Sequence, residues 1–400
     1  MPLPKPRWPL TAALLLTASL LPALQAAADD RPRETAAPPT VYGLRGHLVR
    51  LDRTTLRPLG GRTAPLSSDT WTWSFSADRR RIALVSDSPG PELRFVNLRT
   101  MRVLGDTRLA PRGSAWATAW VAPRRVLGVV VTRGDDTVVA GVDSGTRRVV
   151  WRRELGGSLR VGEPFRRSLV LVLGPSDEVG ESRLVRVSAG GQVRSAPLPG
   201  IRSGHEDTLD SRPGLAIDRP GARAFVVQAG GPVAEVDMRT LALSLRPPLA
   251  GRAPDARSAA TRDALWLRGG LLAVTGLDGT RPAGLTLVDT RRWSARKIDS
   301  RATAAAVAGG TLLASSVFDS RPTVGSGLTG YSLRGRQKFH RYGDEPLGVQ
   351  PVGRRVLVAD ARGGRVEMLD ARTGRVLRRY GRLYAHPIFG DQPFPPTAAG

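Results

Sequence analysis

The sequence predicts an all-β fold, an eight-bladed β-propeller. Three features support it: a recurring hairpin, an apolar strand in each repeat, and complementary partial repeats at the two ends. The hairpin consists of an alternating strand, a turn opened by a small polar residue, and a second strand. Its turn position recurs at intervals of roughly 45 residues, the period of a propeller blade, and is held by Asp52, Asn97, Asp143, Ser188, Asp237, Asp289, Ser332 and Asp370. We expect each side chain to accept a hydrogen bond from the backbone N–H two residues on, closing the turn.

Seven repeats contain all four strands of a blade. Their second strands are apolar and rich in β-branched residues, as expected for strands covered on both faces by neighbouring blades. They are predicted at 81–86, 126–131, 169–173, 224–228, 271–275, 311–316 and 355–359.

The two ends of the repeat region each supply part of one more blade. Residues 40–44, 47–52 and 56–60 predict three strands without a first one, and residues 383–391 resemble the first strand of the preceding repeat, 347–354. Pairing these segments closes the ring and removes the free sheet edges. Seven blades with an irregular N-terminal appendage is the alternative.

The chain outside the repeats predicts an exported protein. Residues 1–28 combine Lys5 and Arg7, an apolar run from Leu10 to Leu24, and a small-residue exit ending at Ala28, the pattern of a signal peptide. The run is about 15 residues, short of the ~20 that span a bilayer, so we expect no membrane anchor after cleavage. Residues 29–40 are predicted to be a flexible linker, 41–391 the propeller, and 392–400 a disordered tail. The expected location is secreted or extracytoplasmic, and the closed ring is expected to be a monomer.

Two segments resemble known repeat families. Leu369–Leu377 is similar to the repeat of secreted propellers of the YVTN type, and Val142–Trp151 resembles the PQQ-type repeat of quinoproteins, which carries a Trp at this place. The resemblance implies a secreted propeller. It also implies, for quinoprotein dehydrogenases, a quinone held with Ca²⁺ and a catalytic Asp in the channel. The chain has no cysteine for the vicinal disulfide that many of those enzymes carry, and it lacks their large insertions.

The charge is strongly positive and nearly all of it is arginine, with a formal net charge of +25 and lysine only at positions 5, 297 and 338. Turns between first and second strands, and between third and fourth strands, emerge on the same face of a propeller. The first set carries Arg79, Arg80, Arg81, Arg124, Arg125, Arg166, Arg167, Arg354 and Arg355. Much of the acid falls in loops of the opposite face, at Asp87, Glu92, Asp135, Asp136, Asp177, Glu178, Glu181, Asp278 and Asp319. We expect either a basic face that binds a cell-envelope polyanion, or turns whose charged side chains are simply solvated. No aromatic residues are interleaved as on a nucleic-acid surface, so nucleic acid is not the expected partner.

Two further clusters are candidate ligand sites on the opposite face. His205, Glu206, Asp207 and Asp210 lie in the longest predicted link, 197–213, where oxygen ligands could hold Ca²⁺ or simply be solvated. Trp71 and Trp116 are equivalent in adjacent repeats and could stack on a flat ligand at the channel mouth, or pack between blades. No cofactor is predicted besides this Ca²⁺.

No sequence pattern of a catalytic constellation is present, since the four histidines fall outside any HExxH or Gly-x-Ser-x-Gly motif. The sequence therefore favours a non-enzymatic binding or scaffolding module, with an unknown protein or an envelope polyanion as partner. The alternative is an enzyme with its site at the channel mouth, either a quinone- or metal-dependent oxidoreductase or a lactonase-like hydrolase.

Overall fold

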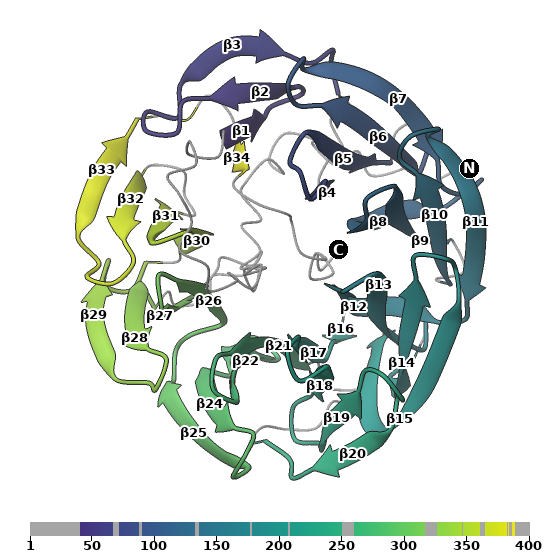
Figure 1. The fold of residues 1–400 in the computed structure, drawn as a ribbon. Coiled ribbons are helices and arrows are strands. Elements are labelled where there is room, and N and C mark those ends of the chain that lie inside the picture. Colours follow the sequence, from purple (N-terminus) through teal and green to yellow (C-terminus); the bar gives the residue numbers. More distant parts are fainter. Residues whose placement is uncertain are drawn as a thin grey trace, which may run out of the picture.

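Eight antiparallel sheets form a ring in the computed structural model (Figure 1). The structure describes residues 41–66, 72–87, 90–132, 136–176, 178–206, 209–249, 260–316, 326–345, 347–360, 365–381, 383 and 386–388. Within these residues the regular elements are strands, with no helix among them. The predicted all-β fold and the count of eight blades are confirmed, and the seven-bladed alternative is wrong. The predicted signal peptide, the linker, and the tail after residue 391 lie outside the described residues.

Each blade runs from an innermost strand beside the central channel to an outermost strand on the circumference (Figure 1). Blade 1 contains β34 (His386–Ile388), β1 (Val41–Leu44), β2 (Leu48–Leu51) and β3 (Pro58–Arg62), and blade 2 contains β4 (Thr72–Phe75), β5 (Arg81–Ser86), β6 (Glu92–Asn97) and β7 (Arg102–Arg108). Blade 3 contains β8 (Ser114–Ala122), β9 (Arg125–Val131), β10 (Thr137–Asp143) and β11 (Arg148–Leu155). Blade 4 contains β12 (Ser158–Phe165), β13 (Ser168–Gly174), β14 (Gly180–Ser188) and β15 (Val193–Glu206), with the short β16 (Leu209–Ser211) paired to β15. Blade 5 contains β17 (Gly214–Asp218), β18 (Arg223–Val227), β19 (Val233–Asp237) and β20 (Leu243–Arg246). Blade 6 contains β21 (Ala260–Leu267), β22 (Leu271–Asp278), β24 (Leu285–Asp289) and β25 (Ser294–Asp299), with the short β23 (Arg281–Pro282) paired to β22. Blade 7 contains β26 (Ala304–Ala308), β27 (Thr311–Ser315), β28 (Leu328–Ser332) and β29 (Gln337–Arg341), and blade 8 contains β30 (Leu347–Val352), β31 (Arg355–Asp360), β32 (Val366–Asp370) and β33 (Val376–Tyr380).

Blade 1 joins the two ends of the chain, as predicted. Strand β1 pairs with β2 on one side and with β34 on the other, in the register Tyr42↔Ile388. Ile388 is 1% exposed and belongs to the apolar cluster shared by blades 1 and 2. The closing strand therefore contributes both backbone hydrogen bonds and core volume.

The hydrophobic core is divided into layers between adjacent blades. All seven residues of β13 are buried, because blades 3 and 5 cover its two faces. In the layer between blades 3 and 4, Leu127 and Val129 pack with Leu169 and Leu171. Because a second strand packs against a neighbouring blade on each of its two faces, the residues of both faces are apolar. The second strands therefore do not alternate between apolar and polar residues.

The repeated turn between third and fourth strands has two forms. At the Asp and Asn positions the side chain accepts backbone N–H bonds two and three residues on, as in Asp370 with Arg372 (3.1 Å) and Thr373 (2.8 Å). The prediction is confirmed for these positions and wrong for the two serines. Ser188 and Ser332 instead accept from the N–H four residues on, at 3.0 Å in both cases. The reason is a turn one residue shorter, which places Gly191 and Gly335 at positive φ (84° and 81°).

Candidate binding surfaces

The predicted basic turns lie on one face of the ring, which we call the arginine turn face. Backbone hydrogen bonds join the two sets of turns: the Leu98 N–H donates to the Arg80 carbonyl, the Ser144 N–H to Arg124, and the Ala371 N–H to Arg354. The same bond therefore recurs in blades 2, 3 and 8 and holds both turns of each blade side by side. The exposed arginines of this face are Arg79, Arg80, Arg124, Arg166, Arg167, Arg354 and Arg355.

Two of the predicted residues are less accessible. Arg81 and Arg125 are half-buried. The Arg81 guanidinium donates to the Ser144 carbonyl of blade 3 (3.2 Å) and lies 5.2 Å from the ring centre of Trp120. Arg81 thus serves as a contact between blades, while its neighbour Arg80 is exposed.

The carboxylates of the arginine turn face are engaged by their own turns. Asp78 accepts the Ser76 hydroxyl (2.6 Å) and the Arg80 N–H (3.1 Å). Asp143 accepts the N–H groups of Thr146 and Gly145, and these bonds, together with the Arg124 guanidinium, lower its pKa to about 2. The same hydrogen bonding, led by the Thr240 N–H, lowers the pKa of Asp237. These carboxylates therefore stay ionised and use their oxygens within their own turns, whereas guanidinium groups such as that of Arg80 are exposed.

Other arginines link neighbouring blades. In each case a guanidinium donates to the backbone carbonyls of the next blade's turn between third and fourth strands. Arg186 of β14 reaches the Met238 carbonyl (2.5 Å), and Arg194 of β15 reaches those of Arg239 (2.7 Å) and Thr240 (2.9 Å). The same link is made by Arg50 to Leu98, Arg81 to Ser144, Arg153 to Gly191, Arg296 to Arg334, and Arg341 to Gly374. Part of the arginine content is thus structural. Sequence reasoning missed this role because the link depends on contacts between repeats.

The acidic cluster at 205–210 lies on a hairpin rather than on a simple link. Strand β15 continues to Glu206 and pairs with β16 in the register His205↔Asp210. Asp207 lies outside the described residues, and only the backbone of His205, Glu206 and Asp210 is described. Among the residues that the structure describes, no three His, Asp or Glu side chains form a group that could hold a metal ion. Ca²⁺ on this hairpin remains a prediction.

The two tryptophans cannot be compared as a pair, because Trp71 lies outside the described residues. Trp116 is half-buried in β8 and packs against the apolar layer between blades 3 and 4. This is the packing role that the sequence analysis offered as the alternative. The stacking of a flat ligand between both rings stays a prediction.

Charged residues beside the channel were not predicted. Burial of Glu163 on the innermost strand β12 raises its pKa to about 7. On the innermost strand β21, burial raises the pKa of Asp263, which forms an ion pair with Arg212 (3.2 Å). Arg262 pairs with Asp278 (2.6 Å). The signal in the sequence that could have identified these residues is a charged residue within an otherwise apolar strand. Because Asp263, Arg212, Arg262 and Asp278 have partners within the chain, they form a structural network rather than an open site.

A further structural result concerns membranes. Within the described ranges, the structure contains no helix with the length and apolar character of a membrane span.

Comparisons with known proteins relate this chain to others through its fold. No protein-family model matches the sequence, and no curated protein is significantly similar to it. Among solved structures, the dihydro-heme d1 dehydrogenase NirN in complex with DHE is similar with a TM-score of 0.63 and 14% identity, over 100% of this chain and 84% of NirN. Apo AztD from Citrobacter koseri gives a TM-score of 0.55 at 12% identity, over 88% and 96% of the two chains. BamB from Moraxella catarrhalis gives 0.51 at 13% identity, over 81% and 93%. At such low identity the similarity is one of fold, and it supports the eight-bladed β-propeller.

Proposed function

We propose that this protein is an exported, non-enzymatic β-propeller that binds an anionic polymer of the cell envelope through its arginine turn face. The observation that carries the proposal is the unequal accessibility of opposite charges on this face. Guanidinium groups such as those of Arg80 and Arg167 are exposed, whereas carboxylates such as that of Asp143 are held by turn N–H groups. Such a surface attracts polyanions over a distance of about one Debye length.

The proposed location follows from the sequence at the N-terminus. The signal-peptide pattern of residues 1–28 supports a location outside the cytoplasm, where polymers bearing phosphate or carboxylate groups are the abundant anions. The absence of cysteine from the sequence means that the fold can form there without disulfides. A closed ring presents its turns as one rigid surface, which limits the conformational entropy lost on binding.

Binding should be electrostatic and therefore sensitive to salt. We would titrate the mature protein against fluorescently labelled inorganic polyphosphate by anisotropy, from roughly 50 mM to 300 mM salt. The logarithm of the binding constant should fall linearly with the logarithm of the salt concentration. Failure of the wild-type protein to bind polyphosphate or polyglutamate at the lowest salt would overturn the proposal.

A matched pair of variants separates charge from fold. Arg80, Arg167, Arg354 and Arg355 are exposed, and within the described residues their side chains make no hydrogen bond or ion pair. Replacing all four with Gln should weaken binding at least about tenfold. It should also make the slope of log K against log salt concentration less steep by about 0.7 to 0.9 for each phosphate contact that is lost. The four Lys substitutions keep the charge and should retain most of the affinity. Equal binding by the Gln variant and the wild type would show that this face is not the binding surface.

The competing enzymatic function makes a separate prediction. Stoichiometric Ca²⁺ or a quinone chromophore in the purified mature protein, lost in Asp207→Ala, would favour a site on the β15–β16 hairpin. Elemental mass spectrometry with an absorbance scan measures both. Neither is needed for the binding function that we propose.

A further inference from the structure

The seam between the neighbouring blades 4 and 5 carries a row of arginines beside the arginine turn face (Figure 1). Arg166 lies in the turn between β12 and β13, Arg186 on the third strand β14, and Arg194 on the outermost strand β15. At a strand spacing of about 4.8 Å, the row spans roughly 12 Å from the inner turn toward the rim. From blade 5, Arg239 joins the row, because the Arg194 guanidinium donates to its carbonyl (2.7 Å).

The ring of Phe165 holds two of these guanidinium groups close together. The Arg166 and Arg186 guanidinium groups lie 5.2 and 5.6 Å from the ring centre. Phe165 is buried in the apolar layer between blades 4 and 5, so the position of its ring is fixed. Attraction of each cation to the aromatic ring partly offsets the repulsion between the two like charges.

No carboxylate neutralises this row. Within the described residues, none of its four guanidinium groups forms an ion pair. Burial lowers the pKa of Arg186, and the positive charges of Arg194 and Arg166 lower it further. The carboxylate of the adjoining turn, that of Asp237, accepts backbone N–H groups of its own turn, including that of Arg239 (2.8 Å).

The next seam, between blades 5 and 6, shows the opposite arrangement. Glu235 of β19 is equivalent to Arg186, since each lies two residues before the residue that opens the turn between third and fourth strands. Glu235 forms ion pairs with Arg223 (2.9 Å) and Arg246 (2.7 Å). Burial lowers the pKa of Arg223, but hydrogen bonds to Asp218 and Glu235 raise it above its ordinary value. These arginines of blade 5 are therefore neutralised within the chain, whereas those of the seam between blades 4 and 5 are not.

Three arginines of the row keep donors for a ligand, since Arg166, Arg194 and Arg239 are exposed. The Arg194 guanidinium uses one N–H of Nη1 and one of Nη2 for the carbonyls of Arg239 and Thr240. A guanidinium carries five N–H donors, so three remain. The side chains of Arg166 and Arg239 make no hydrogen bond within the described residues.

We propose that this seam binds phosphate groups of a linear anionic polymer and is the specific subsite of the polyanion binding proposed above, on which this inference rests. The three exposed guanidinium groups belong to two turns and a strand. A tetrahedral phosphate accepts hydrogen bonds from several directions, whereas the two oxygens of a carboxylate lie in one plane. Because the row runs outward along the seam, successive phosphate groups of one polymer can lie along it. Arg186 adds positive charge, while its own donors serve the Ser168 hydroxyl (3.0 Å) and the Met238 carbonyl (2.5 Å).

The test uses two charge-matched double variants of the mature protein. Arg166→Gln with Arg239→Gln removes two exposed charges of the seam without breaking the link that Arg194 makes between blades. Arg291→Gln with Arg292→Gln removes two exposed arginines beside Asp289, in the turn of blade 6 that is equivalent to the turn of Arg239. Anisotropy with labelled polyphosphate at about 50 mM salt should show roughly tenfold weaker binding by the seam variant and less than about threefold by the blade 6 variant. Thermal unfolding of both variants checks that the fold is retained.

The outcomes distinguish this inference from the proposed function. Equal weakening of both variants would overturn the seam as a specific subsite and leave the basic face in place. Absence of wild-type binding to polyphosphate and to polyglutamate would overturn the proposed function itself. We expect the seam variant to lose less affinity for polyglutamate than for polyphosphate, and equal losses would refute recognition of phosphate. A loss seen with vesicles of phosphatidylglycerol and not with polyphosphate would refute the polymer as the occupant.

Discussion

The arginines that link neighbouring blades should stabilise the ring, and Arg186 tests this. Its Nε donates to the Ser168 hydroxyl (3.0 Å), its Nη1 donates to the Met238 carbonyl, and its guanidinium lies 5.6 Å from the Phe165 ring centre. Arg186→Met keeps the aliphatic stem and removes both hydrogen bonds. Met238 is 0% exposed. Its carbonyl therefore loses a charged donor at a site that water does not readily reach.

The expected cost can be worked from these contacts. A hydrogen bond to a charged group contributes about 1.5–3 kcal/mol, and an unsatisfied buried acceptor costs about 1–3 kcal/mol. Because the guanidinium is only half-buried, we expect a loss of about 2–4 kcal/mol in the free energy of unfolding. For a domain of about 350 residues this lowers Tm by roughly 3–6 °C.

Thermal and urea unfolding of Arg186→Met should be compared with Arg167→Met. Arg167 lies in the same blade, but its side chain is exposed and makes no hydrogen bond or ion pair within the described residues. This control should stay within about 0.5 kcal/mol of the wild type. If the two variants unfold alike, the guanidinium links do not hold the blades together, and the structural explanation of the arginine content is wrong.

Two further predictions concern the ring closure and the turns. Ile388→Ala should lower the free energy of unfolding by about 2–4 kcal/mol, because this side chain is 1% exposed. Leu59→Ala in the same blade should lower it little, since Leu59 is 61% exposed. Similar losses in the two variants would contradict closure of the ring by β34. The lowered pKa of Asp143 means that its carboxylate stabilises the fold above about pH 4, and that this contribution is lost as the pH falls toward about 2. Asp143→Asn keeps the turn, as Asn97 does in blade 2. Its stability deficit at about pH 6 should therefore disappear by about pH 2, and a deficit independent of pH would refute this assignment.

The sequence was sufficient for the fold because each repeat carries its own local signal. Asp52 and Asp370 mark equivalent turns that depend on residues two or three positions away. The apolar runs beginning at Arg81 and Arg355 coincide with the starts of β5 and β31. Closure of the ring was predictable because the missing first strand at one end matched the extra strand at the other.

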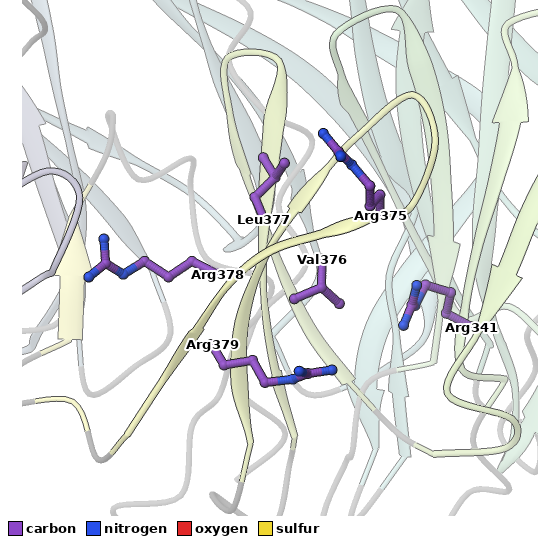
Figure 2. A pocket seen from close by; sticks show the side chains of 6 residues that line it. All are labelled: Arg341, Arg375, Val376, Leu377, Arg378 and Arg379. Atoms are coloured by element: carbon purple, nitrogen blue, oxygen red, sulfur yellow. The ribbon is translucent and has the colours of Figure 1, made fainter.

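The binding surfaces were less predictable because they depend on contacts between repeats. Arg80 and Arg81 are adjacent in the sequence, yet one is exposed and the other contacts blade 3. Arg378 and Arg379 are also adjacent in the sequence, yet Arg379 pairs with Glu367 while Arg378 points to the other side of β33 (Figure 2). Pro197 suggested the start of a link, but β15 continues through it to Glu206. The register of that long strand is set by pairing with β14, which no local pattern reveals.

The most direct test of the central claim is to map which arginines a polyanion covers. The mature protein would be treated with an arginine-specific dicarbonyl reagent, with and without polyphosphate, and modification measured at each position by mass spectrometry. We predict protection of Arg80, Arg167 and Arg354 by the polymer, and no change at Arg186, whose guanidinium is held by its own protein contacts. Equal modification of Arg80, Arg167 and Arg354 with and without polymer would contradict the proposal that this face binds an anionic partner.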